Sequence, residues 1–426
     1  MQTNFSTITV VGLGYIGLPT AAVLASRKLK VIGVDVNDHV VDLINQGRIH
    51  IVEPDLDILV HASVSEGYLT ATTQPKPADV FLIAVPTPFI VGQDGSYTPD
   101  ISFIKAATKS IAPVLKRGSL VILESTSPVG TTEQMASWLG QERPDLTFPQ
   151  EYGENSDIRI AYCPERVLPG RVLEELVTND RVIGGLTEKC SIIASQLYKT
   201  FVKGECIVTN ARTAEMCKLT ENSYRDVNIA FANELSIICD KLDINIWELI
   251  NLANRHPRVN ILRPGSGVGG HCIAVDPWFI VSKTPSEAQL IRSARLVNDS
   301  KPEWVLNKLK ALLQHQIKQS NNTKKRFVVA CLGLSFKPDI DDLRESPAVY
   351  IAGKIADLHN IELMIVEPHI MQLPDSLENK ATLSSINEVK HKADIVIILV
   401  AHQHFKESKV NQWKDINIMD VCGLNS

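Results

Sequence analysis

The first part of the chain alternates short apolar runs with longer segments of helical periodicity. The apolar runs have the length of buried strands, and they cover residues 7–11, 30–34, 80–85 and 119–123. A helix-like segment, residues 101–115, separates the last two. Strands that alternate with helices are typical of a parallel sheet with helices on both faces. We therefore expect a doubly wound α/β domain over residues 1–209.

The pattern changes in the middle of the chain. Residues 213–242 contain neither Gly nor Pro, and they read as helix throughout. This is long for a helix of a globular protein, and long central helices often join domains or form dimer interfaces. The rest of the middle part, to about residue 313, shows little strand pattern. We expect a central helical region over residues 210–319, built on one long helix that either joins the domains or forms a dimer interface.

Strands and helices alternate again after a polar stretch at residues 320–325, which is typical of a linker. Three apolar runs and one helical segment follow, and they cover residues 327–332, 346–358, 362–366 and 395–400. The first turn of this part reads GLSFKPDIDDLRESP and lacks the pattern GxGxxG. We expect a second doubly wound domain over residues 320–426, similar to the first in fold and different in ligand. The chain is thus predicted to hold two Rossmann-like α/β domains joined by the helical region.

The composition argues against several classes of protein. The chain has 426 residues, 44% of them hydrophobic, and a net charge of −5 with no long basic run, so nucleic-acid binding is not expected. Its apolar runs are far shorter than the roughly 20 residues of a membrane span, and its first residues lack a signal-peptide pattern. We expect a cytoplasmic protein without a membrane partner. The eight cysteines form no CxxC pair and do not cluster with histidines, so no metal site is predicted.

The turn after the first apolar run reads GLGYIG and opens a helical segment. Its first glycine suits a tight turn, its second lets the backbone approach a pyrophosphate, and its third lets helix pack on strand. Asp35 ends the next strand, where a carboxylate binds ribose hydroxyls and repels a 2′-phosphate. We therefore predict NAD rather than NADP; the alternative is a glycine turn without cofactor. The cofactor-binding residues expected in this turn are Gly12, Gly14, Tyr15, Ile16 and Gly17.

Two further loops follow predicted strands of the same domain, VPTP at 85–88 and ESTSPVG at 124–130. Ligands of open α/β sheets lie outside the carboxyl ends of the strands. Thr87, Thr126 and Thr132 are therefore candidates to line the nicotinamide half of the cofactor. The alternative is ordinary turn chemistry of Ser, Thr and Pro.

The long predicted helix carries polar residues on one face. Lys218, Asn222 and Arg225 stand at positions i, i+4 and i+7. A Lys ammonium beside an Asn amide can stabilise an oxyanion, and a partly buried Lys can carry a proton. The alternative is a stripe of side chains in water.

A lone Cys272 follows the glycine-rich turn at residues 265–270. Arg255, His256, Arg258 and Arg263 precede the turn. These donors suit a diphosphate, and the alternative is that they are scattered surface charges. Glycines let a substrate approach closely and leave the sulfur uncovered. A nucleophilic thiol next to NAD chemistry suggests aldehyde oxidation: the thiolate adds to the carbonyl, hydride leaves, and water cleaves the thioester. Taken by itself, Cys272 would be read as a buried, inert residue.

Seven ordered motifs resemble the UDP-glucose/GDP-mannose dehydrogenase family over essentially the full length of the chain. They are GLGYIGLPTA (12–21), AVPTPF (84–89), ILESTSPVGTTE (122–133), AYCPERVLPG (161–170), TAEMCKLTENSYRDVNIAFANE (213–234), NRHPRVNILRPGSGVGGHCIAVDPWFI (254–280) and GLSFKPDIDDLRESPA (333–348). The resemblance implies a four-electron oxidation, in which the C6 alcohol of a nucleotide sugar becomes a carboxylate with two NAD in turn. It implies that Cys272 forms the thiohemiacetal and thioester, and that Lys218, helped by Asn222, transfers protons and stabilises the oxyanion.

The resemblance also implies roles for residues outside the thiol turn. Asp276 and Glu165 would organise or activate the hydrolytic water, and Thr126 would touch both cofactor and reacting centre. Arg344 would reach the cofactor from the last domain. The residues implied for substrate binding are Arg166, Val167, Lys218, Asn222, Arg225, His256, Arg258, Gly269, Phe336 and Lys337. Family members pair through the central helix, so a homodimer is expected, with Arg258 acting across its interface.

One departure from the family bears on the substrate. Relatives that oxidise glucose carry Pro and Lys just after the cysteine, whereas this chain has Ala274 and Val275 within CIAVDP. The resemblance therefore implies a UDP-N-acetylhexosamine. Overall likeness favours UDP-N-acetyl-D-mannosamine over UDP-N-acetyl-D-glucosamine, and the product would be a building block of surface polysaccharides. Two alternatives stay open: a catalytically silent regulator that binds nucleotide sugar and NAD, and a two-electron hydroxyacid dehydrogenase that works by its lysine alone.

Overall fold

The computed structural model describes residues 5–93, 97–168, 170–270, 272–320, 326–413 and 416–424, except for the side chains of residues 319 and 320. These residues form two compact units. The first comprises Met1–Glu221 and Trp278–Thr284, and the second comprises Asn222–Pro277 and Pro285–Ser426. The division into three domains stays a prediction, and the linker expected at 320–325 lies, beyond Ser320, outside the described residues.

The first unit is built on an eight-stranded sheet with the order β10-β9-β8-β7-β4-β1-β2-β3. Its strands are β1 (Thr7–Val11), β2 (Lys30–Val34), β3 (Leu69–Thr72), β4 (Val80–Ile83), β7 (Leu120–Leu123), β8 (Arg159–Tyr162), β9 (Arg181–Gly185) and β10 (Cys206–Asn210). The four strands expected from the apolar runs are confirmed. All neighbours pair in parallel except β8 and β9, which pair antiparallel. The four predicted strands pair in parallel, as expected; β8 and β9 were not predicted, and an apolar run does not encode the direction of its strand.

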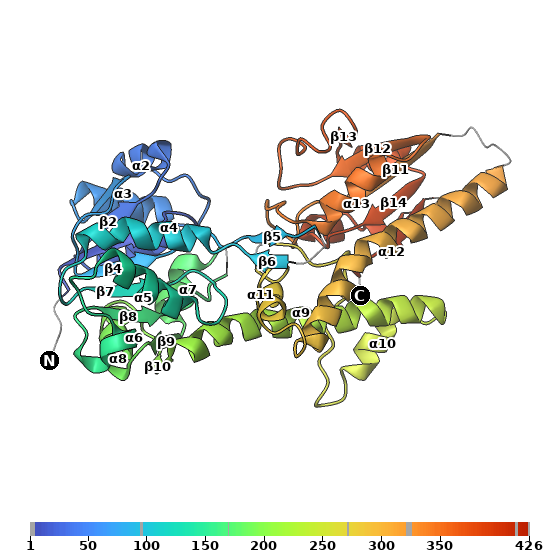
Figure 1. Cartoon of the computed structure of the whole chain (residues 1–426). Helices are drawn as coiled ribbons and strands as arrows, with labels where there is room; N and C mark the ends of the chain where they lie inside the picture. Colours follow the sequence, from blue (N-terminus) through green and yellow to red (C-terminus); the bar gives the residue numbers. More distant parts are fainter. Residues whose placement is uncertain are drawn as a thin grey trace. The chain divides into compact units, whose positions relative to one another are not determined.

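Helices cover both faces of this sheet, as the alternation of elements predicts (Figure 1). One core lies under α1 (Gly17–Ser26), α2 (Asp38–Asn45), α3 (Leu56–Ser65), α7 (Val172–Thr178) and α8 (Glu188–Tyr198). The other lies under α4 (Ser102–Ile111) and α5 (Thr131–Glu142), and the short α6 (Pro149–Tyr152) follows Phe148 of this core. Side chains along each strand enter the two cores alternately: Leu82 faces the first, while Phe81 and Ile83 face the second. A separate antiparallel pair is formed by β5 (Phe89–Val91) and β6 (Tyr97–Pro99).

The middle of the chain is helical, as expected. The long helix α9 (Ala211–Lys241) has 31 residues and passes from the first unit into the second. It is followed by α10 (Ile246–Ala253), α11 (Asp276–Lys283) and the 32-residue α12 (Gln289–Ser320), which contains Pro302.

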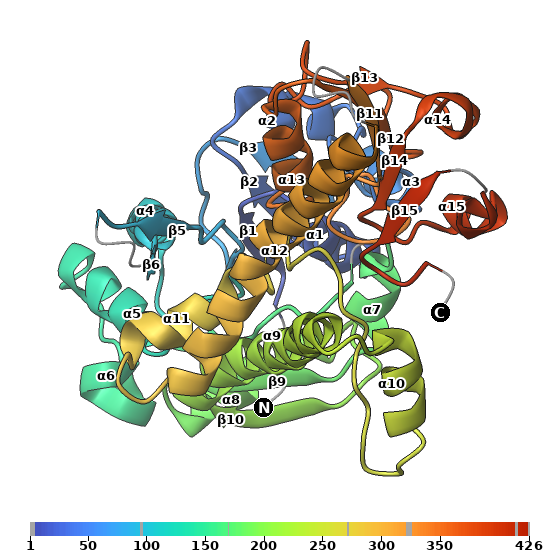
Figure 2. The same ribbon diagram turned by 90° about the vertical axis from the view of Figure 1, so that its right-hand side faces the viewer.

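A second, wholly parallel sheet forms the core of the second unit. Its order is β13-β12-β11-β14-β15, with strands Thr382–Leu383, Ile361–Val366, Phe327–Leu332, Ile395–Ile398 and Asn417–Asp420 in that order. Helices α12 and α13 (Pro347–Ala356) pack on one face, and α14 (Ile386–Lys392) and α15 (Gln403–Glu407) pack on the other (Figure 2). The second Rossmann-like fold is thereby confirmed.

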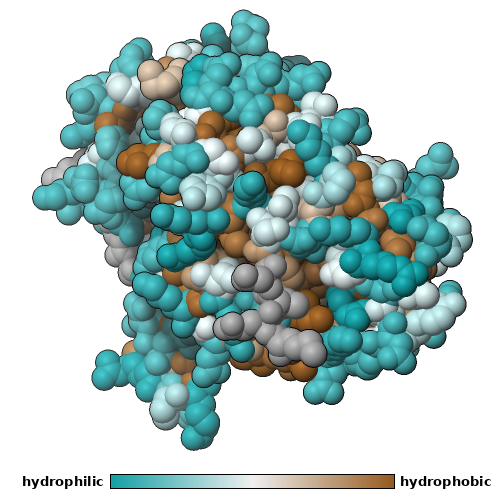
Figure 3. Space-filling view, turned by 90° about the vertical axis from the view of Figure 1, so that its left-hand side faces the viewer, coloured by the Kyte–Doolittle hydropathy of each residue, from teal (hydrophilic) through white to brown (hydrophobic). Residues whose placement is uncertain are grey.

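Among the described residues, no helix combines the length and the apolarity that a bilayer span requires. The face drawn in Figure 3 is mainly hydrophilic, with hydrophobic residues in small groups. Against such a surface, several exposed apolar side chains on one element indicate an interaction site.

Candidate active site

The glycine turn after β1 has the shape that a pyrophosphate needs. A Cβ on Gly12 would lie 2.4 Å from the carbonyl oxygen of Ala84, and one on Gly17 would lie 1.8 Å from that of Gly12. No heavy atom of the described chain, apart from the neighbouring residues, lies within 4 Å of the corresponding point at Gly14. Within the described residues, no side chain caps the N-terminus of α1 at Ile16, and such a helix end favours negative charge. The turn therefore fits a dinucleotide.

Asp35 lies directly after β2 and is tied to the glycine turn. Its Oδ2 accepts a hydrogen bond from the N–H of Leu13 at 3.0 Å, and its Oδ1 accepts one from the N–H of Asn37 at 3.0 Å. The carboxylate is half-buried and is held beside the turn in a fixed orientation. Between Gly14 and Gly17, Tyr15 is exposed and Ile16 is half-buried.

The structure brings the two threonine-bearing loops together. The hydroxyl of Ser125 accepts a hydrogen bond from the N–H of Val85 at 2.9 Å, which joins the loop after β4 to the loop after β7. Thr87 and Thr126 are half-buried on these loops. Thr132 is fully buried instead, and its hydroxyl donates to Oε1 of Glu215 at 2.6 Å. Its expected contact with the cofactor stays a prediction.

Glu215 is a structural residue that the sequence did not reveal. Its carboxylate also accepts hydrogen bonds from the N–H groups of Gly130, at 2.6 Å, and Thr132, at 2.8 Å. It therefore caps the N-terminus of α5, where the helix dipole favours negative charge. Burial raises its pKa, while the hydrogen bonds from Thr132 and Gly130 oppose that shift. The sequence shows Glu215 as an acidic residue on a predicted helix, and such residues usually face water, so its burial could not be predicted.

Glu165 lies in a buried cluster of charged groups. It forms an ion pair of 2.6 Å with Arg181, and both side chains are almost fully buried. Its other oxygen accepts the N–H of Arg166 at 2.7 Å. Glu124, which the sequence analysis did not select, accepts a hydrogen bond from the hydroxyl of Tyr198 at 2.6 Å. Burial, followed by the charge of Glu165, raises the pKa of Glu124 to about 7.

Arg166 and Val167 follow this cluster on the same loop. The Arg166 guanidinium pairs with Glu221 at 2.7 Å and donates to the carbonyl oxygen of Asp180 at 2.6 Å. Val167 is half-buried and packs against the first core. Their predicted contact with substrate is not tested by these interactions.

The polar face of α9 is present as predicted. Lys218 and Asn222 are half-buried and one turn apart, and Arg225 is exposed. Asn222 Nδ2 donates a hydrogen bond of 2.5 Å to Oδ2 of Asp276, which is the first residue of α11 and is buried. Two predicted catalytic residues, 54 positions apart, are thus in direct contact.

Cys272 is exposed and lies in the turn that leads into α11. Its carbonyl oxygen accepts a hydrogen bond from the N–H of Asp276 at 2.8 Å, so the two residues are one turn apart. The next carbonyl, that of Ile273, lies 3.5 Å from Nη1 of Arg295. Arg295 is itself buried in an ion pair of 2.6 Å with Asp226. Sequence reasoning missed this supporting pair, because its two members are 69 residues apart and show no motif.

The glycine-rich turn packs against the loop that follows β11. A Cβ on Gly269 would lie 2.4 Å from the carbonyl oxygen of Glu345 and 2.9 Å from the Cβ of Phe336. The N–H of Gly270 donates to the carbonyl oxygen of Arg344 at 3.2 Å. The predicted substrate residues Gly269 and Phe336 are therefore in contact. Lys337 follows on the same loop and is half-buried.

The remaining predicted residues are on the surface. His256 and Arg258 are exposed in the loop after α10, whose ends are joined by two hydrogen bonds between Asn254 and Ile261. Arg344 forms an ion pair of 2.6 Å with Asp342. The roles of these three residues in binding stay predictions.

Comparison with known protein families accounts for this arrangement. Residues 6–202 match the NAD binding domain of the UDP-glucose/GDP-mannose dehydrogenase family, residues 212–300 its central domain, and residues 330–423 its UDP binding domain. The chain belongs to the UDP-glucose/GDP-mannose dehydrogenase family. It is thus an NAD-dependent dehydrogenase of UDP-sugars, and the expectations of an oxidoreductase and of NAD are confirmed.

Full-length relatives lie within the same family. The chain is 63% identical to a UDP-N-acetyl-D-mannosamine dehydrogenase of Yersinia pestis, covering 99% of both chains. It is 61% identical to an NDP-N-acetyl-D-galactosaminuronic acid dehydrogenase of Ralstonia nicotianae, covering 99% of this chain and 96% of that one. Among solved structures, a UDP-D-ManNAc dehydrogenase of Pyrococcus horikoshii matches with a TM-score of 0.83 and 38% identity, covering 99% of this chain and 96% of that one.

Proposed function

We propose that this dehydrogenase oxidises the C6 alcohol of UDP-N-acetyl-D-mannosamine to the carboxylate. The observation that carries the proposed chemistry is the exposed Cys272, one turn before the buried Asp276 that Asn222 holds. The choice of sugar is supported by the 63% identical relative and by the CIAVDP sequence that includes Ala274 and Val275. The product is UDP-N-acetyl-D-mannosaminuronate.

The proposed reaction has two oxidations and one hydrolysis. NAD, which the glycine turn and Asp35 would hold, would supply the hydride acceptor for both oxidations. In the first, Lys218 passes the hydroxyl proton to water and, with Asn222, stabilises the alkoxide, and loss of the hydride leaves an aldehyde. The Cys272 thiolate then adds to the aldehyde carbon to give a thiohemiacetal, and loss of the second hydride leaves a thioester. Water attacks the thioester, the C–S bond breaks, and the carboxylate and the thiolate are released.

We infer that Asp276, rather than Glu165, takes the proton of that water. Asp276 begins α11 and its N–H donates to the carbonyl oxygen of Cys272, so it lies one turn after the residue that would carry the thioester. Glu165 is almost fully buried, and both of its oxygens already have partners, one in the ion pair with Arg181 and the other in the hydrogen bond from the N–H of Arg166. Glu165 would instead fix the loop that carries Arg166, whose N–H donates to it.

A second candidate substrate is the galacto epimer. The 61% identity to the Ralstonia relative is nearly as high as the 63% identity to the Yersinia relative. Comparison of kcat/KM for UDP-N-acetyl-D-mannosamine, its galacto and gluco epimers and UDP-glucose decides between them. We expect the manno sugar to exceed each of the others by at least about tenfold, which corresponds to about 1.4 kcal/mol in the transition state. A higher kcat/KM for another sugar would refute the assignment.

We also propose a homodimer formed through α9. Three large apolar residues recur every seven positions on this helix: Tyr224, Phe231 and Ile238 are 71%, 51% and 45% exposed. Residues seven apart lie on one face of a helix, and such a stripe is typical of a helix that packs against a partner. Light scattering of Phe231→Glu should give a monomer, whereas Lys310→Glu, at an exposed position of α12, should stay dimeric. A monomeric wild-type protein would contradict the proposal.

A further inference from the structure

The two Rossmann-like folds of this chain share a detail at their first turn. Gly12 follows β1 with φ +92°, and its N–H donates to the carbonyl oxygen of Val34 at 2.8 Å. Gly333 follows β11 with φ +91°, and its N–H donates to the carbonyl oxygen of Val366 at 2.9 Å. The acid after the second strand is Asp35 in the first fold and Glu367 in the second. Glu367 therefore occupies the position at which dinucleotide-binding folds receive a ribose.

Glu367 differs from Asp35 because its carboxylate is buried and its hydrogen-bond partners all come from the surrounding protein. It is only 4% exposed, and its Oε2 accepts the N–H groups of Leu334, at 2.7 Å, and Ser335, at 3.1 Å. The same oxygen lies 3.0 Å from Nε2 of His402, which is fully buried. Burial opposes ionisation, but the hydrogen bonds from His402 and the backbone lower the pKa of Glu367 below its ordinary value. A ribose has no access to this carboxylate.

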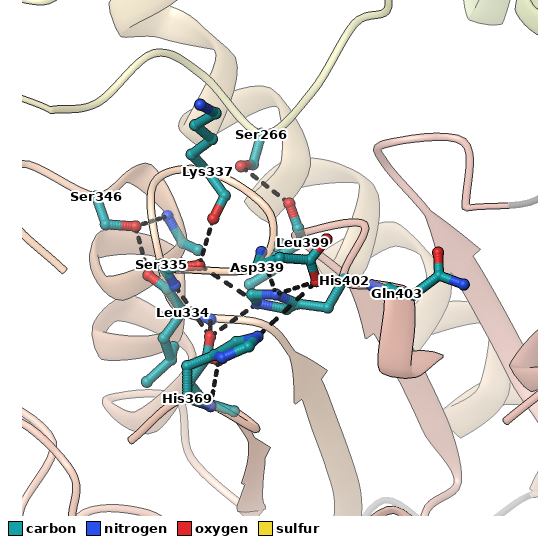
Figure 4. A network of polar contacts seen from close by, with 12 residues as sticks. Ser266, Leu334, Ser335, Lys337, Asp339, Ser346, His369, Leu399, His402 and Gln403 are labelled. Atoms are coloured by element: carbon teal, nitrogen blue, oxygen red, sulfur yellow. Dashed lines mark hydrogen bonds and ion pairs between the residues drawn. The ribbon is translucent and has the colours of Figure 1, made fainter. Parts of the chain in front are cut away.

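The imidazole of His402 is also used on its other side (Figure 4). Its Nδ1 accepts a hydrogen bond from the N–H of Asp339 at 2.9 Å, so the ring proton belongs on Nε2, facing Glu367. Ser335 Oγ lies 3.3 Å from Nε2 and donates to the carbonyl oxygen of Lys337 at 2.7 Å. His402 thus connects to both ends of residues 334–339.

A metal centre is a competing interpretation of this cluster. Ligand atoms of Asp339, His369 and His402 lie within 4.8 Å of one another, which is close enough to share an ion. A metal would need a lone pair of His402, however, and the lone pair on Nδ1 already accepts the N–H of Asp339. The geometry therefore favours a supporting role for the histidine over metal binding.

Residues 334–339 contact the glycine-rich turn that precedes Cys272. Phe336, in the middle of this segment, contacts the glycine-rich turn: a Cβ on Gly270 would be 2.9 Å from Cε2 of the Phe336 ring. Gly270 is two residues before Cys272. Lys337 is the next residue after Phe336, and both are predicted to contact the UDP portion of the substrate.

We propose that His402 is a positioning residue for UDP-sugar binding. Its hydrogen bond to Glu367 keeps that carboxylate from binding a ribose. Its contacts with Ser335 and Asp339 hold residues 334–339 in the conformation in which Phe336 and Lys337 bind UDP. The role in UDP binding rests on the proposed function, whereas the hold on residues 334–339 does not. His402 acts through these residues and not on the reacting atoms.

Calorimetry of UDP and NAD binding to the full-length protein tests the proposal. We expect His402→Ala to weaken UDP binding by about tenfold or more, because two buried hydrogen bonds are lost, and to change NAD binding by less than about twofold. His402→Gln, whose amide keeps a donor and an acceptor, should recover part of the loss. His404→Ala, at an exposed histidine of α15, is the matched control and should bind UDP as the wild type does. Wild-type UDP affinity in His402→Ala, or an equal loss of UDP and NAD affinity, would overturn the proposal.

Amide hydrogen exchange gives a readout that does not depend on the ligand. In His402→Ala, the N–H groups of Leu334, Ser335 and Asp339 should exchange faster, while those of Gly12 and Leu13 should be unchanged. Unchanged exchange at residues 334–339 would overturn the positioning role. If the wild type failed to oxidise every UDP-N-acetylhexosamine, the proposed function would fail, and the exchange result would still decide whether His402 holds this loop.

Discussion

Asn222 donates a hydrogen bond of 2.5 Å to the carboxylate of Asp276. The contact joins the middle of α9 to the first residue of α11, one turn after Cys272. Because an amide N–H stabilises a carboxylate in one orientation, the bond fixes which lone pairs of Asp276 remain for other partners. The polar face of α9 and the thiol turn therefore act as one unit of the proposed chemistry.

Removal of this hydrogen bond should slow turnover. We expect Asn222→Ala to lower kcat by about tenfold or more, because Asp276 loses its orientation and the oxyanion loses a donor. The KM for NAD should not change. Steady-state kinetics of Asn228→Ala provide the control, because this variant loses an amide that donates to the Tyr224 carbonyl of the same helix. An undiminished kcat in Asn222→Ala would remove this residue from the mechanism.

The choice of cofactor should depend on Asp35. In Asp35→Asn we expect the KM for NAD to rise by about tenfold, since a charge-assisted hydrogen bond to ribose is lost, and the discrimination against NADP to narrow. Initial rates with both cofactors measure the effect. Asp38→Asn, an exposed position at the start of α2, should keep wild-type values. Equal use of NAD and NADP by the wild type would refute the ribose contact.

Glu124 should make stability depend on pH. Its pKa is raised from 4.5 to about 7, first by burial and then by the charge of Glu165, so the folded state holds a proton that the unfolded state releases. The stabilisation is present below pH 4.5 and is lost as the pH rises through about 7. The free energy of unfolding should therefore fall between pH 5 and pH 8, with a contribution from this group of at most about 1.4 kcal/mol per pH unit.

Urea unfolding of Glu124→Gln at several pH values checks this expectation. The variant keeps the shape of the side chain but cannot titrate, so its unfolding free energy should fall less over this range. Glu142→Gln, a partly exposed position on α5, should follow the wild type. Parallel pH profiles for the wild type and Glu124→Gln would show that the buried carboxyl does not titrate there.

The sequence predicts the elements of this fold better than their directions and their buried polar contacts. Short apolar runs identified β1, β2 and β4, whose side chains are mostly buried, and the absence of Gly and Pro over residues 213–242 identified α9. Neither pattern could reveal that β9 runs antiparallel to β8, since strand direction depends on the connection between them.

The candidate site divides in the same way. The glycine turn and Asp35 could be predicted from the sequence, because the binding of a pyrophosphate and a ribose restricts the residue types at fixed spacing. Glu215 and the Asp226–Arg295 pair could not be predicted, because a charged residue on a helix usually lies in water. Their burial depends on partners far away in the sequence, as Arg295 and Asp226 illustrate. Glu124 was passed over because its neighbour Glu165 comes from another strand end.

The central claim is that Cys272 carries the sugar through a second oxidation. The most direct test is the number of NADH molecules formed for each UDP-N-acetyl-D-mannosamine consumed by the wild type, with Cys272→Ser measured beside it. We predict a ratio of two for the wild type and the loss of steady-state turnover in the variant. A ratio near one, or a variant that turns over as fast as the wild type, would contradict the thioester mechanism.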